Sequence, residues 1–413
     1  MMDVTDWLNE YGGEGYALCV KRLSGNDTLA NGTHQAGPYL PKSFLFEVFP
    51  SINRTDVKNP DHKFTLYVDS HPDTRQVRAI YYNNRFSEGV KGGRNETRLT
   101  RFGGGSSALL DPESTGALTV FAFTMGGDGA AVDCHVWVCR DETEEDVVEE
   151  RVGPVEPGRW AIISPFAPPT LFHPVVPTSP TTCWLAPHQI PPAWLTAFPT
   201  GAEIIAKAAA LQSHASLMVD KRLMRRRECE YELFRSLEEA VELPLIKAGF
   251  SDIDGFVARA QTVLQRRKAR AGRSLELHAR QIFIEEKLVQ GVNFDHQSES
   301  EGGNKPDFLF PSKAAYQDPS FPAADLRMLA VKTTLKDRWR QILKEADRVS
   351  EKHLLTLQEG ISESQFQQVM DAKVRLVVPQ PIIEKFPRSV QPHLQTLESF
   401  IGDVRLLRLT ASK

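Results

Sequence analysis

RMLAVKTTLKDRW (residues 327–339) joins a short apolar run to a lysine. Residues 328–331 have the pattern of a buried strand, and Lys332 follows them directly. Lysine is seldom buried without an acidic partner, so its position indicates a charged role where a strand ends. Two residues before Lys332, where an accompanying carboxylate would be sought first, the chain has Ala330.

The overall composition is that of a globular protein. The chain has 413 residues, of which 41% are hydrophobic and 25% charged, so two or three domains are expected. The sequence contains no run of about 18 apolar residues, and its N-terminus has no apolar segment, so we expect neither a membrane span nor a secretory signal. With a net charge of −4, any contact with nucleic acid must depend on local basic patches.

The cysteines are few and scattered. None forms a C-x-x-C pair, and no histidine spacing indicates a zinc site. We predict buried thiols in a reducing cytoplasm for all five: Cys19, Cys134, Cys139, Cys183 and Cys229.

The N-terminal part of the chain carries short β-type patterns separated by Gly, Asn and Asp. They are ALCVKRL, KFTLYVDS, VRAIYYN, ALTVFAFTM and CHVWVC. Short strands at this spacing indicate a barrel or a sandwich. We interpret the acidic run DETEEDVVEE (141–150) as a solvated segment.

The C-terminal part begins after a change in composition. Residues 165–192 contain nine prolines, which favour extended backbone, and we interpret this region as an interdomain linker. Helical patterns follow from residue 201, including one that starts at Ser274 as N-cap and one over 338–351. The strand-like segments DFLF, RMLAVKTT and VRLVVP alternate with them, which predicts an α/β domain with a central mixed sheet.

Three acids are candidates to converge on Lys332. Asp307 follows a proline and opens an apolar strand, Glu345 borders an apolar helical stripe, and Glu276 lies near the start of its predicted helix. Each acid also has a structural explanation: a turn aspartate, a surface ion pair, or an acid at a helix N-terminus. Two such carboxylates could hold Mg²⁺, which activates water and stabilises charge during phosphodiester hydrolysis, while a lysine stabilises the phosphate. The stripe beside Glu345 consists of Trp339, Ile342, Ala346 and Val349.

This pattern resembles the PD-(D/E)XK nuclease superfamily, in a minority arrangement where a glutamate on the following helix replaces the acid missing at Ala330. The wider sequence resembles the EcoRII family of type II restriction endonucleases. In the C-terminal half the resemblance rests on RRKARAGRSLELH, GNKPDFLFPS, LRMLAVKTTLKDRWRQILKEAD and HLLTLQEG. In the N-terminal half it rests on NDTLANGTHQAGPYLP, FPSINRT, RAIYYNNRF, GRNETRLTRFGGG and DPESTGALTVFAF.

The resemblance implies an α/β (α+β) multidomain fold. Its parts would be a β-rich, B3-like DNA-binding pseudobarrel at 1–165, a proline-rich linker at 166–200 and a restriction-endonuclease-like α/β/α catalytic domain at 201–413. It also implies a bacterial, cytoplasmic homodimer that uses Mg²⁺ to cleave double-stranded DNA at CCWGG, where W is A or T. The N-terminal domain would bind a second copy of the site and relieve autoinhibition, and a cognate DNA methyltransferase would be a functional partner.

The resemblance also assigns roles within the catalytic domain. Asp307, Lys332 and Glu345 would be catalytic, with Asp307 and Glu345 as metal ligands and Lys332 orienting the attacking water. Glu276 would be a supporting acid. Tyr316 and Lys336 lie in the same family segments and are expected to position phosphate or base.

Basic segments supply the candidates for DNA contact. KRLMRRRE (221–228) and QRRKARAGR (265–273) are either DNA-binding runs or solvated helix faces, and we predict base reading by Arg226 and Arg227. In the N-terminal domain, residues 31–39 and 90–101 are predicted to form two arms that grip DNA. Their candidate contacts are His34, Lys91, Arg94, Asn95, Glu96 (which can accept from cytosine N4) and Arg98.

Two other functions remain open at this point. One is a non-catalytic DNA-binding regulator built from a B3-like domain and a degenerate nuclease fold, which the intact set of Asp307, Lys332 and Glu345 argues against. The other is a repair nickase of the same superfamily, which would produce single-strand nicks instead of double-strand breaks.

Overall fold

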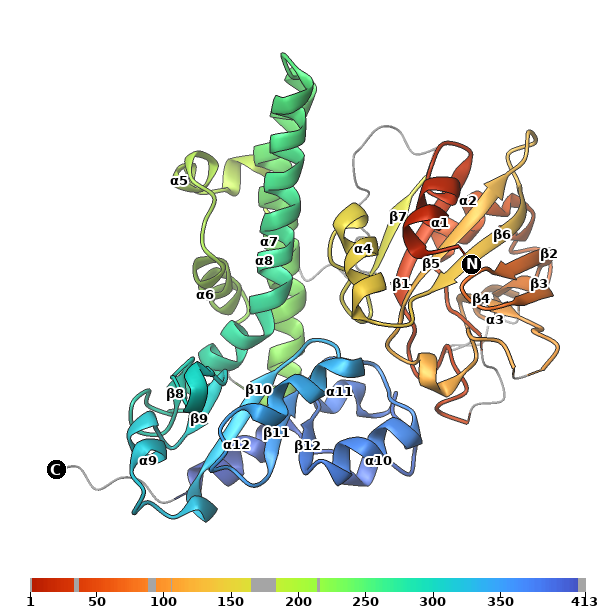
Figure 1. Cartoon of the computed structure of the whole chain (residues 1–413). Helices are drawn as coiled ribbons and strands as arrows, with labels where there is room; N and C mark the ends of the chain where they lie inside the picture. Colours follow the sequence, from red (N-terminus) through yellow and green to blue (C-terminus); the bar gives the residue numbers. More distant parts are fainter. Residues whose placement is uncertain are drawn as a thin grey trace. The chain divides into compact units, whose positions relative to one another are not determined.

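The computed structural model describes residues 2–32, 37–87, 94–104, 106–164, 183–213 and 216–407. It divides into two compact units, which are described separately (Figure 1). The first comprises Met1–Val175, Gln358–Phe366 and Lys385–Gln391, and the second comprises Val176–Leu357, Gln367–Glu384 and Pro392–Lys413. Within the described ranges, no helix is both long enough and apolar enough to cross a membrane.

The first unit is built on a seven-stranded sheet in the order β4-β3-β2-β6-β5-β1-β7. All its strand pairings are antiparallel except that of β2 with β6. The five β-type patterns in the sequence coincide with β1, β2, β3, β5 and β6, which confirms those predictions. The strands are β1 (Tyr16–Arg22), β2 (Asp61–Val68), β3 (Asp73–Tyr82), β4 (Glu96–Thr100), β5 (Leu118–Met125), β6 (Ala131–Val138) and β7 (Trp160–Ile163).

Both faces of this sheet are buried. Successive side chains of a strand point to opposite faces, so on β5 Phe121 packs in one apolar cluster while Val120 packs in another. Phe44 of α2 joins the first cluster, and Trp7 of α1 and Val148 of α4 join the second. The helical segments of this unit are α1 (Val4–Tyr11), α2 (Lys42–Val48), η1 (Pro50–Ile52), α3 (Asn84–Ser87), η2 (Pro112–Ser114) and α4 (Glu142–Val152).

The acidic run at 141–150 is not simply a solvated segment, because it forms α4 and turns one face inward. Asp141 caps the helix by accepting from the backbone N–H of Glu144 at 3.0 Å. Glu145 is buried, and its carboxylate accepts from Arg22 of β1 at 2.7 Å and from the backbone of Leu118 at 3.2 Å. A buried cation on the central sheet therefore explains why part of this run faces inward.

The second unit contains a five-stranded sheet in the order β12-β11-β10-β9-β8. The pairs β10–β11 and β11–β12 are parallel, whereas β9–β10 and β8–β9 are antiparallel, so the predicted mixed sheet is confirmed. The strands are β8 (Asp295–His296), β9 (Phe308–Phe310), β10 (Arg327–Val331), β11 (Lys352–Leu355) and β12 (Val374–Val377).

Helices and short 3₁₀ segments complete the second unit, apart from α10, whose residues are divided between the two units. The helices are α5 (Pro192–Thr196), α6 (Gly201–Leu211), α7 (Val219–Ala248), α8 (Ile253–Glu285), α9 (Lys313–Gln317), α10 (Glu363–Asp371), α11 (Gln380–Ile383) and α12 (Leu397–Arg405). The 3₁₀ segments are η3 (Pro187–Gln189), η4 (Glu301–Gly303), η5 (Ala323–Asp325), η6 (Lys336–Lys344) and η7 (Gln391–His393), the last beginning in the first unit.

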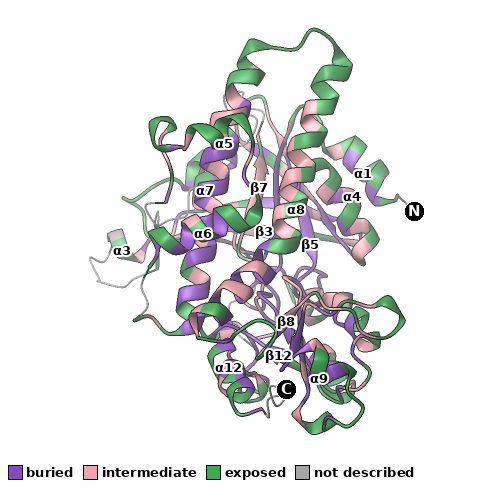
Figure 2. Ribbon diagram, turned by 90° about the vertical axis from the view of Figure 1, so that its left-hand side faces the viewer, coloured by how far each residue is buried: buried purple, intermediate pink, exposed green. Residues whose placement is uncertain are grey.

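Helices α7 and α8 form a long antiparallel hairpin whose far end is exposed (Figures 1 and 2). Arginines of α8 pair with buried glutamates of α7, as in Arg270–Glu230 and Arg267–Glu238. The prediction of a helix that starts at Ser274 is wrong, because α8 runs straight through this position. The residues before Ser274 are mostly good helix formers, and the Ser274 hydroxyl donates to Glu230 instead of capping a helix.

The prediction of five free thiols is also wrong, because Cys183 and Cys229 form a disulfide. The bond joins the C-terminal part of the proline-rich segment (165–192) to α7. The two cysteines are 46 residues apart in sequence, so only the packing of the chain brings them together. Cys19, Cys134 and Cys139 are buried thiols, as predicted.

We predict that loss of the buried Arg22–Glu145 ion pair strongly destabilises the first unit. Replacement of Arg22 by Met should lower the free energy of unfolding by about 3–5 kcal/mol, because it leaves the Glu145 carboxylate buried without its cation. Urea unfolding followed by tryptophan fluorescence measures the change. The control is Arg54→Met in the exposed pair with Asp56, where no measurable change is expected. Equal stability of Arg22→Met and the unaltered chain would contradict the prediction.

Candidate active site

Lys332 lies where central strand β10 ends. Its backbone N–H donates to the carbonyl of Leu355 at 3.0 Å, which continues the parallel pairing of β10 with β11. Ala330 is fully buried, whereas Lys332 is only partly buried. The structure therefore confirms the predicted strand, and it presents the lysine at the end of that strand.

Asp307 lies directly before β9, the antiparallel neighbour of β10. Its Oδ2 accepts from the backbone N–H of Val331 at 2.7 Å, which fixes the carboxylate beside the residue that precedes Lys332. Burial, together with the negative charges of Glu276 and Glu345, raises the pKa of Asp307 to about 6. The Val331 N–H and the Lys332 ammonium act in the opposite direction.

Glu345 follows η6 and has extended backbone angles, φ −92° and ψ 143°. The predicted helix over 338–351 is therefore wrong: η6 ends at Lys344, and Ala346 has φ +50°, which does not continue a right-handed helix. All four residues of the predicted apolar stripe are nevertheless buried. Burial raises the pKa of Glu345, and the charge of Lys332 lowers it, so this carboxylate interacts electrostatically with the lysine.

Glu276 lies inside α8 and not near a helix start, contrary to the prediction. It is buried, and its Oε1 accepts from the side-chain amide of Gln297 at 2.7 Å and contacts Nε2 of His296. Sequence reasoning missed His296 and Gln297, because neither belongs to a motif and both reach Glu276 only through the fold.

The acids around Lys332 are of the residue type that a hard divalent cation prefers. Among the residues that the structure describes, no three or more His, Cys, Asp or Glu side chains are arranged to hold a metal ion. Mg²⁺ needs only one or two protein carboxylates, because phosphate and water supply its other ligands. Burial is the main cause of the raised pKa of Asp307, and the charges of Glu276 and Glu345 add to it, so a bound cation would offset both effects.

The two remaining candidates of the catalytic half differ in their surroundings. Tyr316 of α9 is buried, and its hydroxyl contacts the carboxylate of Glu301, which raises the pKa of the phenol together with burial. Lys336 is the first residue of η6 and is partly buried. The Tyr316 hydroxyl is thus engaged within the protein, while Lys336 lies four residues beyond Lys332.

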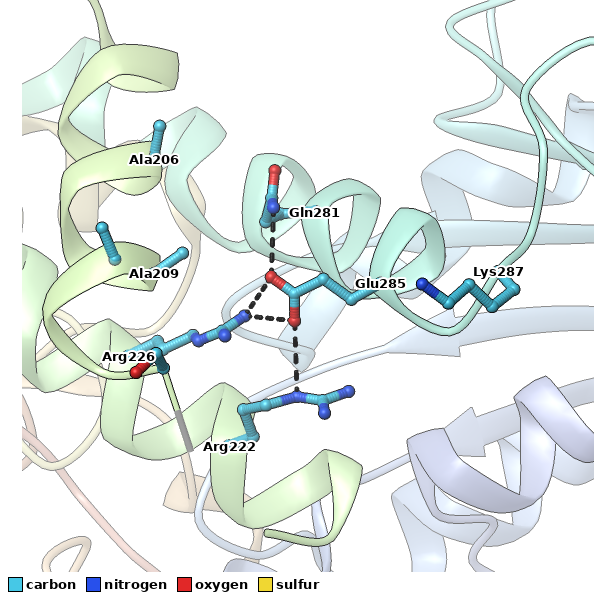
Figure 3. A pocket seen from close by; sticks show the side chains of 9 residues that line it. Ala206, Ala209, Arg222, Arg226, Gln281, Glu285 and Lys287 are labelled. Carbon is cyan, nitrogen blue, oxygen red and sulfur yellow. Dashed lines mark hydrogen bonds and ion pairs between the residues drawn. The ribbon is translucent and has the colours of Figure 1, made fainter. Parts of the chain in front are cut away.

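The structure places Arg226 and Arg227 inside the second unit and not on a surface. Arg226 donates to both carboxylate oxygens of Glu285, at 2.7 and 2.6 Å, beside a cavity of about 490 Å³ (Figure 3). Arg227 is also buried and donates to Ser274 at 3.4 Å. In this conformation these guanidinium groups hold α7 against α8, which counts against our prediction that they read bases. The cavity is lined by Ala206, Ala209, Ala210, Ser213, Arg222, Arg226, Gln281, Glu285 and Lys287.

The described parts of the two predicted DNA-gripping arms lie side by side in the first unit. Tyr39 forms an isolated antiparallel bridge with Arg98. The Arg98 guanidinium donates to the carbonyls of Asn26 at 3.1 Å and Gly37 at 3.2 Å. The arms are therefore joined where β4 begins.

The remaining contact candidates surround the start of β4 or lie outside the described residues. Arg94 is exposed and lies over the ring of Tyr82, and Asn95 accepts from the Tyr81 hydroxyl at 2.7 Å. Glu96 accepts from Arg98 at 3.3 Å. His34 and Lys91 fall outside the described residues.

Comparison with known proteins gives matches in both halves of the chain. Residues 12–165 match the family described as restriction endonuclease EcoRII, N-terminal, and residues 234–401 match the EcoRII C-terminal family. The type II restriction enzyme EcoRII of Escherichia coli is 44% identical over 404 residues, which cover 97% of this chain and 96% of that enzyme.

Solved structures give weaker similarities. A structure of metal-depleted Ecl18kI in complex with uncleaved, modified DNA is 17% identical, with a TM-score of 0.42, and the match covers 54% of this chain and 84% of that one. The B3 domain of the UbaLAI restriction endonuclease with cognate DNA is 17% identical, with a TM-score of 0.25, over 38% of this chain and 97% of that one.

The family matches and the two sheets together confirm the predicted fold class and the predicted relationship. The identity to the Escherichia coli enzyme extends through nearly the whole length of both proteins. This chain belongs to the EcoRII family of type II restriction endonucleases.

Proposed function

We propose that this protein hydrolyses phosphodiester bonds of double-stranded DNA at CCWGG sites and requires Mg²⁺. The proposal is supported by the position of Asp307, whose carboxylate accepts from the Val331 backbone beside Lys332, and by the influence of the Lys332 charge on the pKa of both Asp307 and Glu345. The recognition sequence is supported by the similarity to the Escherichia coli enzyme alone.

The proposed roles follow from the positions of the side chains. Asp307 and Glu345 would hold the Mg²⁺ ion, which when bound lowers the pKa of a water molecule and stabilises charge on the phosphate. The Lys332 ammonium orients the attacking water and stabilises the developing negative charge. Glu276 supports Asp307 from α8, and Tyr316 and Lys336 position the phosphate or a base.

We further propose a separate role for each domain of the chain. Residues 1–165 form an effector domain whose DNA contacts include His34, Lys91, Arg94, Asn95, Glu96 and Arg98. Residues 166–200 are a linker, and residues 201–413 form the catalytic domain. Cleavage of both strands of a two-fold symmetric site requires two active sites, which supports a homodimer. We place this homodimer in the bacterial cytoplasm. Its substrate would be DNA that a cognate methyltransferase has not modified.

Autoinhibition by the effector domain is part of the proposal. It is supported by the composition of the first unit, in which residues 358–366 and 385–391 pack together with the N-terminal residues. The backbone N–H of Gly25 donates to the carbonyl of Glu359 at 2.6 Å, and Gln365 donates to the carbonyl of Glu113 at 3.2 Å. Segments on either side of β12 are thereby tied to the effector domain.

Cleavage of plasmid DNA tests the function. With Mg²⁺, run-off sequencing of the products should show double-strand breaks at CCWGG. Asp307→Ala, Lys332→Ala and Glu345→Ala should each slow cleavage about 10³-fold or more while DNA binding persists, because each loses charge stabilisation at the reacting phosphate. The control is Glu351→Ala, since this exposed carboxylate pairs with Arg375. Nicked circles as the end product would indicate a nickase, and binding without cutting under any divalent ion would indicate a regulator.

The raised pKa of Asp307 predicts a gain in stability on neutralisation. Its pKa is about 6 in the folded chain and 3.8 in the unfolded chain, so the folded state binds the proton more tightly. Stability is therefore lost as pH rises from about 4 to above 6. At pH 8 without divalent ions, Asp307→Asn should raise the free energy of unfolding by up to about 3 kcal/mol, and by little at pH 4. Calorimetric melting at the two pH values, with exposed Asp371→Asn as control, measures this difference. An equal effect at both would contradict the assignment.

A steric change tests autoinhibition. A Cβ at Gly25 would lie 2.5 Å from the carbonyl oxygen of Lys385, so Gly25→Ala should loosen the packing of residues 358–366 and 385–391. Cleavage of DNA with a single CCWGG site should then accelerate about 5-fold or more. Gly13→Ala is the matched control, because a Cβ there meets nothing within 4 Å. An unchanged rate on single-site DNA, with cleavage of two-site DNA intact, would count against this contact as the inhibitory one.

A further inference from the structure

Two adjacent residues that have no assigned role both contact the same carboxylate oxygen. His296 closes the edge strand β8, and Gln297 follows it. His296 contacts Glu276 Oε1 through Nε2, and Gln297 donates to that same oxygen through its side-chain amide at 2.7 Å. A carboxylate oxygen can accept more than one hydrogen bond, so both side chains can hold Glu276 through this one atom.

The backbone at Gln297 makes this arrangement possible. Successive side chains of an extended strand point to opposite faces, so two neighbours cannot normally reach one atom. Gln297 has φ +50°, in the left-handed region that non-glycine residues seldom adopt. The change of direction turns its side chain back towards Glu276.

The same two residues are tied to Asp307 and its strand. The backbone N–H of Gln297 donates to the carbonyl of Asp307 at 2.9 Å. His296 pairs in register with Phe308, and its ring stacks on that phenylalanine with centroids 5.1 Å apart. The pair thus connects α8, which carries Glu276, to the start of β9, which carries Asp307.

The chemistry of the two donors suits this position. Burial is the main cause of the raised pKa of Asp307, and the negative charge of Glu276 adds to it. A lysine or arginine between them would neutralise the charge and compete with a metal ion for the carboxylates. An amide and an imidazole ring can fix the direction of a carboxylate by hydrogen bonding without placing a permanent positive charge beside it.

We propose that His296 and Gln297 are positioning residues that hold the Glu276 carboxylate towards Asp307 for a divalent cation. This inference rests on the proposed function. The left-handed backbone at Gln297 lets the side chains of His296 and Gln297 reach the same Glu276 oxygen. Removal of either side-chain donor should weaken metal binding without unfolding the chain.

The test measures binding of Mn²⁺ alone to the full chain, through the electron paramagnetic resonance signal of the free ion. His296→Phe keeps the ring on Phe308 but removes the donor, and Gln297→Met keeps the length but removes the amide. Each should weaken Mn²⁺ binding about 10-fold and raise the Mg²⁺ concentration for half-maximal cleavage by a similar factor. Melting temperatures in EDTA report the loss of stability from leaving the buried Glu276 carboxylate with one donor fewer, and Mn²⁺ binding is measured at a temperature where every variant is folded.

Two further variants sharpen the result. Gln297→Asn keeps an amide and tolerates the left-handed backbone but is one methylene shorter, so it should also weaken Mn²⁺ binding. Gln290→Met is the matched control, because this exposed amide bonds Arg280 away from the acids. If Asp307→Ala abolishes Mn²⁺ binding while the His296 and Gln297 variants bind normally, the inference fails and the proposed function stands. If the unaltered chain neither binds Mn²⁺ nor cleaves DNA, both fail.

Discussion

The candidate site depends on keeping like charges close together in a partly dry environment. Asp307, Glu276 and Glu345 are all acidic; burial is the main reason why the pKa of Asp307 is raised, and the charges of the other two acids add to it. The short hydrogen bond from the Val331 backbone to Asp307 opposes this rise in pKa, as does the charge of Lys332. Because the bond uses a backbone N–H where β10 ends, the position of the acid follows from the pairing of β9 with β10.

In the proposed site, Glu345 supplies the acid that position 330 lacks. Ala330 is fully buried within the sheet, and no carboxylate stands there. Glu345 lies 13 residues after Lys332 in the sequence; burial raises its pKa, and the charge of that lysine acts in the opposite direction. Ile342 and Ala346, on either side of Glu345, are buried and hold the backbone in place. The proposed chemistry requires a carboxylate near Lys332. Here that carboxylate comes from the irregular segment after η6 and not from strand β10.

Apolar patterns predicted the strands well, because each strand core depends mainly on local alternation and burial. They did not predict where helices end. The apolar stripe after Lys332 has helical spacing, yet Ala346 turns left-handed and ends the segment. In α8 the sequence predicted a helix start where there is none. Ser274 has the residue type of an N-cap, but its hydroxyl donates a hydrogen bond to the buried Glu230. The Cys183–Cys229 bond and the contacts of Glu276 join residues far apart in sequence, which spacing cannot reveal.

The basic runs give the same lesson about charge. The number of cations in each run predicts a DNA-binding surface. In the structure, however, Arg267 and Arg270 pair with buried glutamates of α7, and Arg226 pairs with Glu285. These cations are matched within the protein, and breaking such buried pairs to contact DNA would leave carboxylates without partners. In a chain of net charge −4, the exposed Arg94 beside β4 is therefore a better candidate for the proposed DNA contacts than these buried arginines.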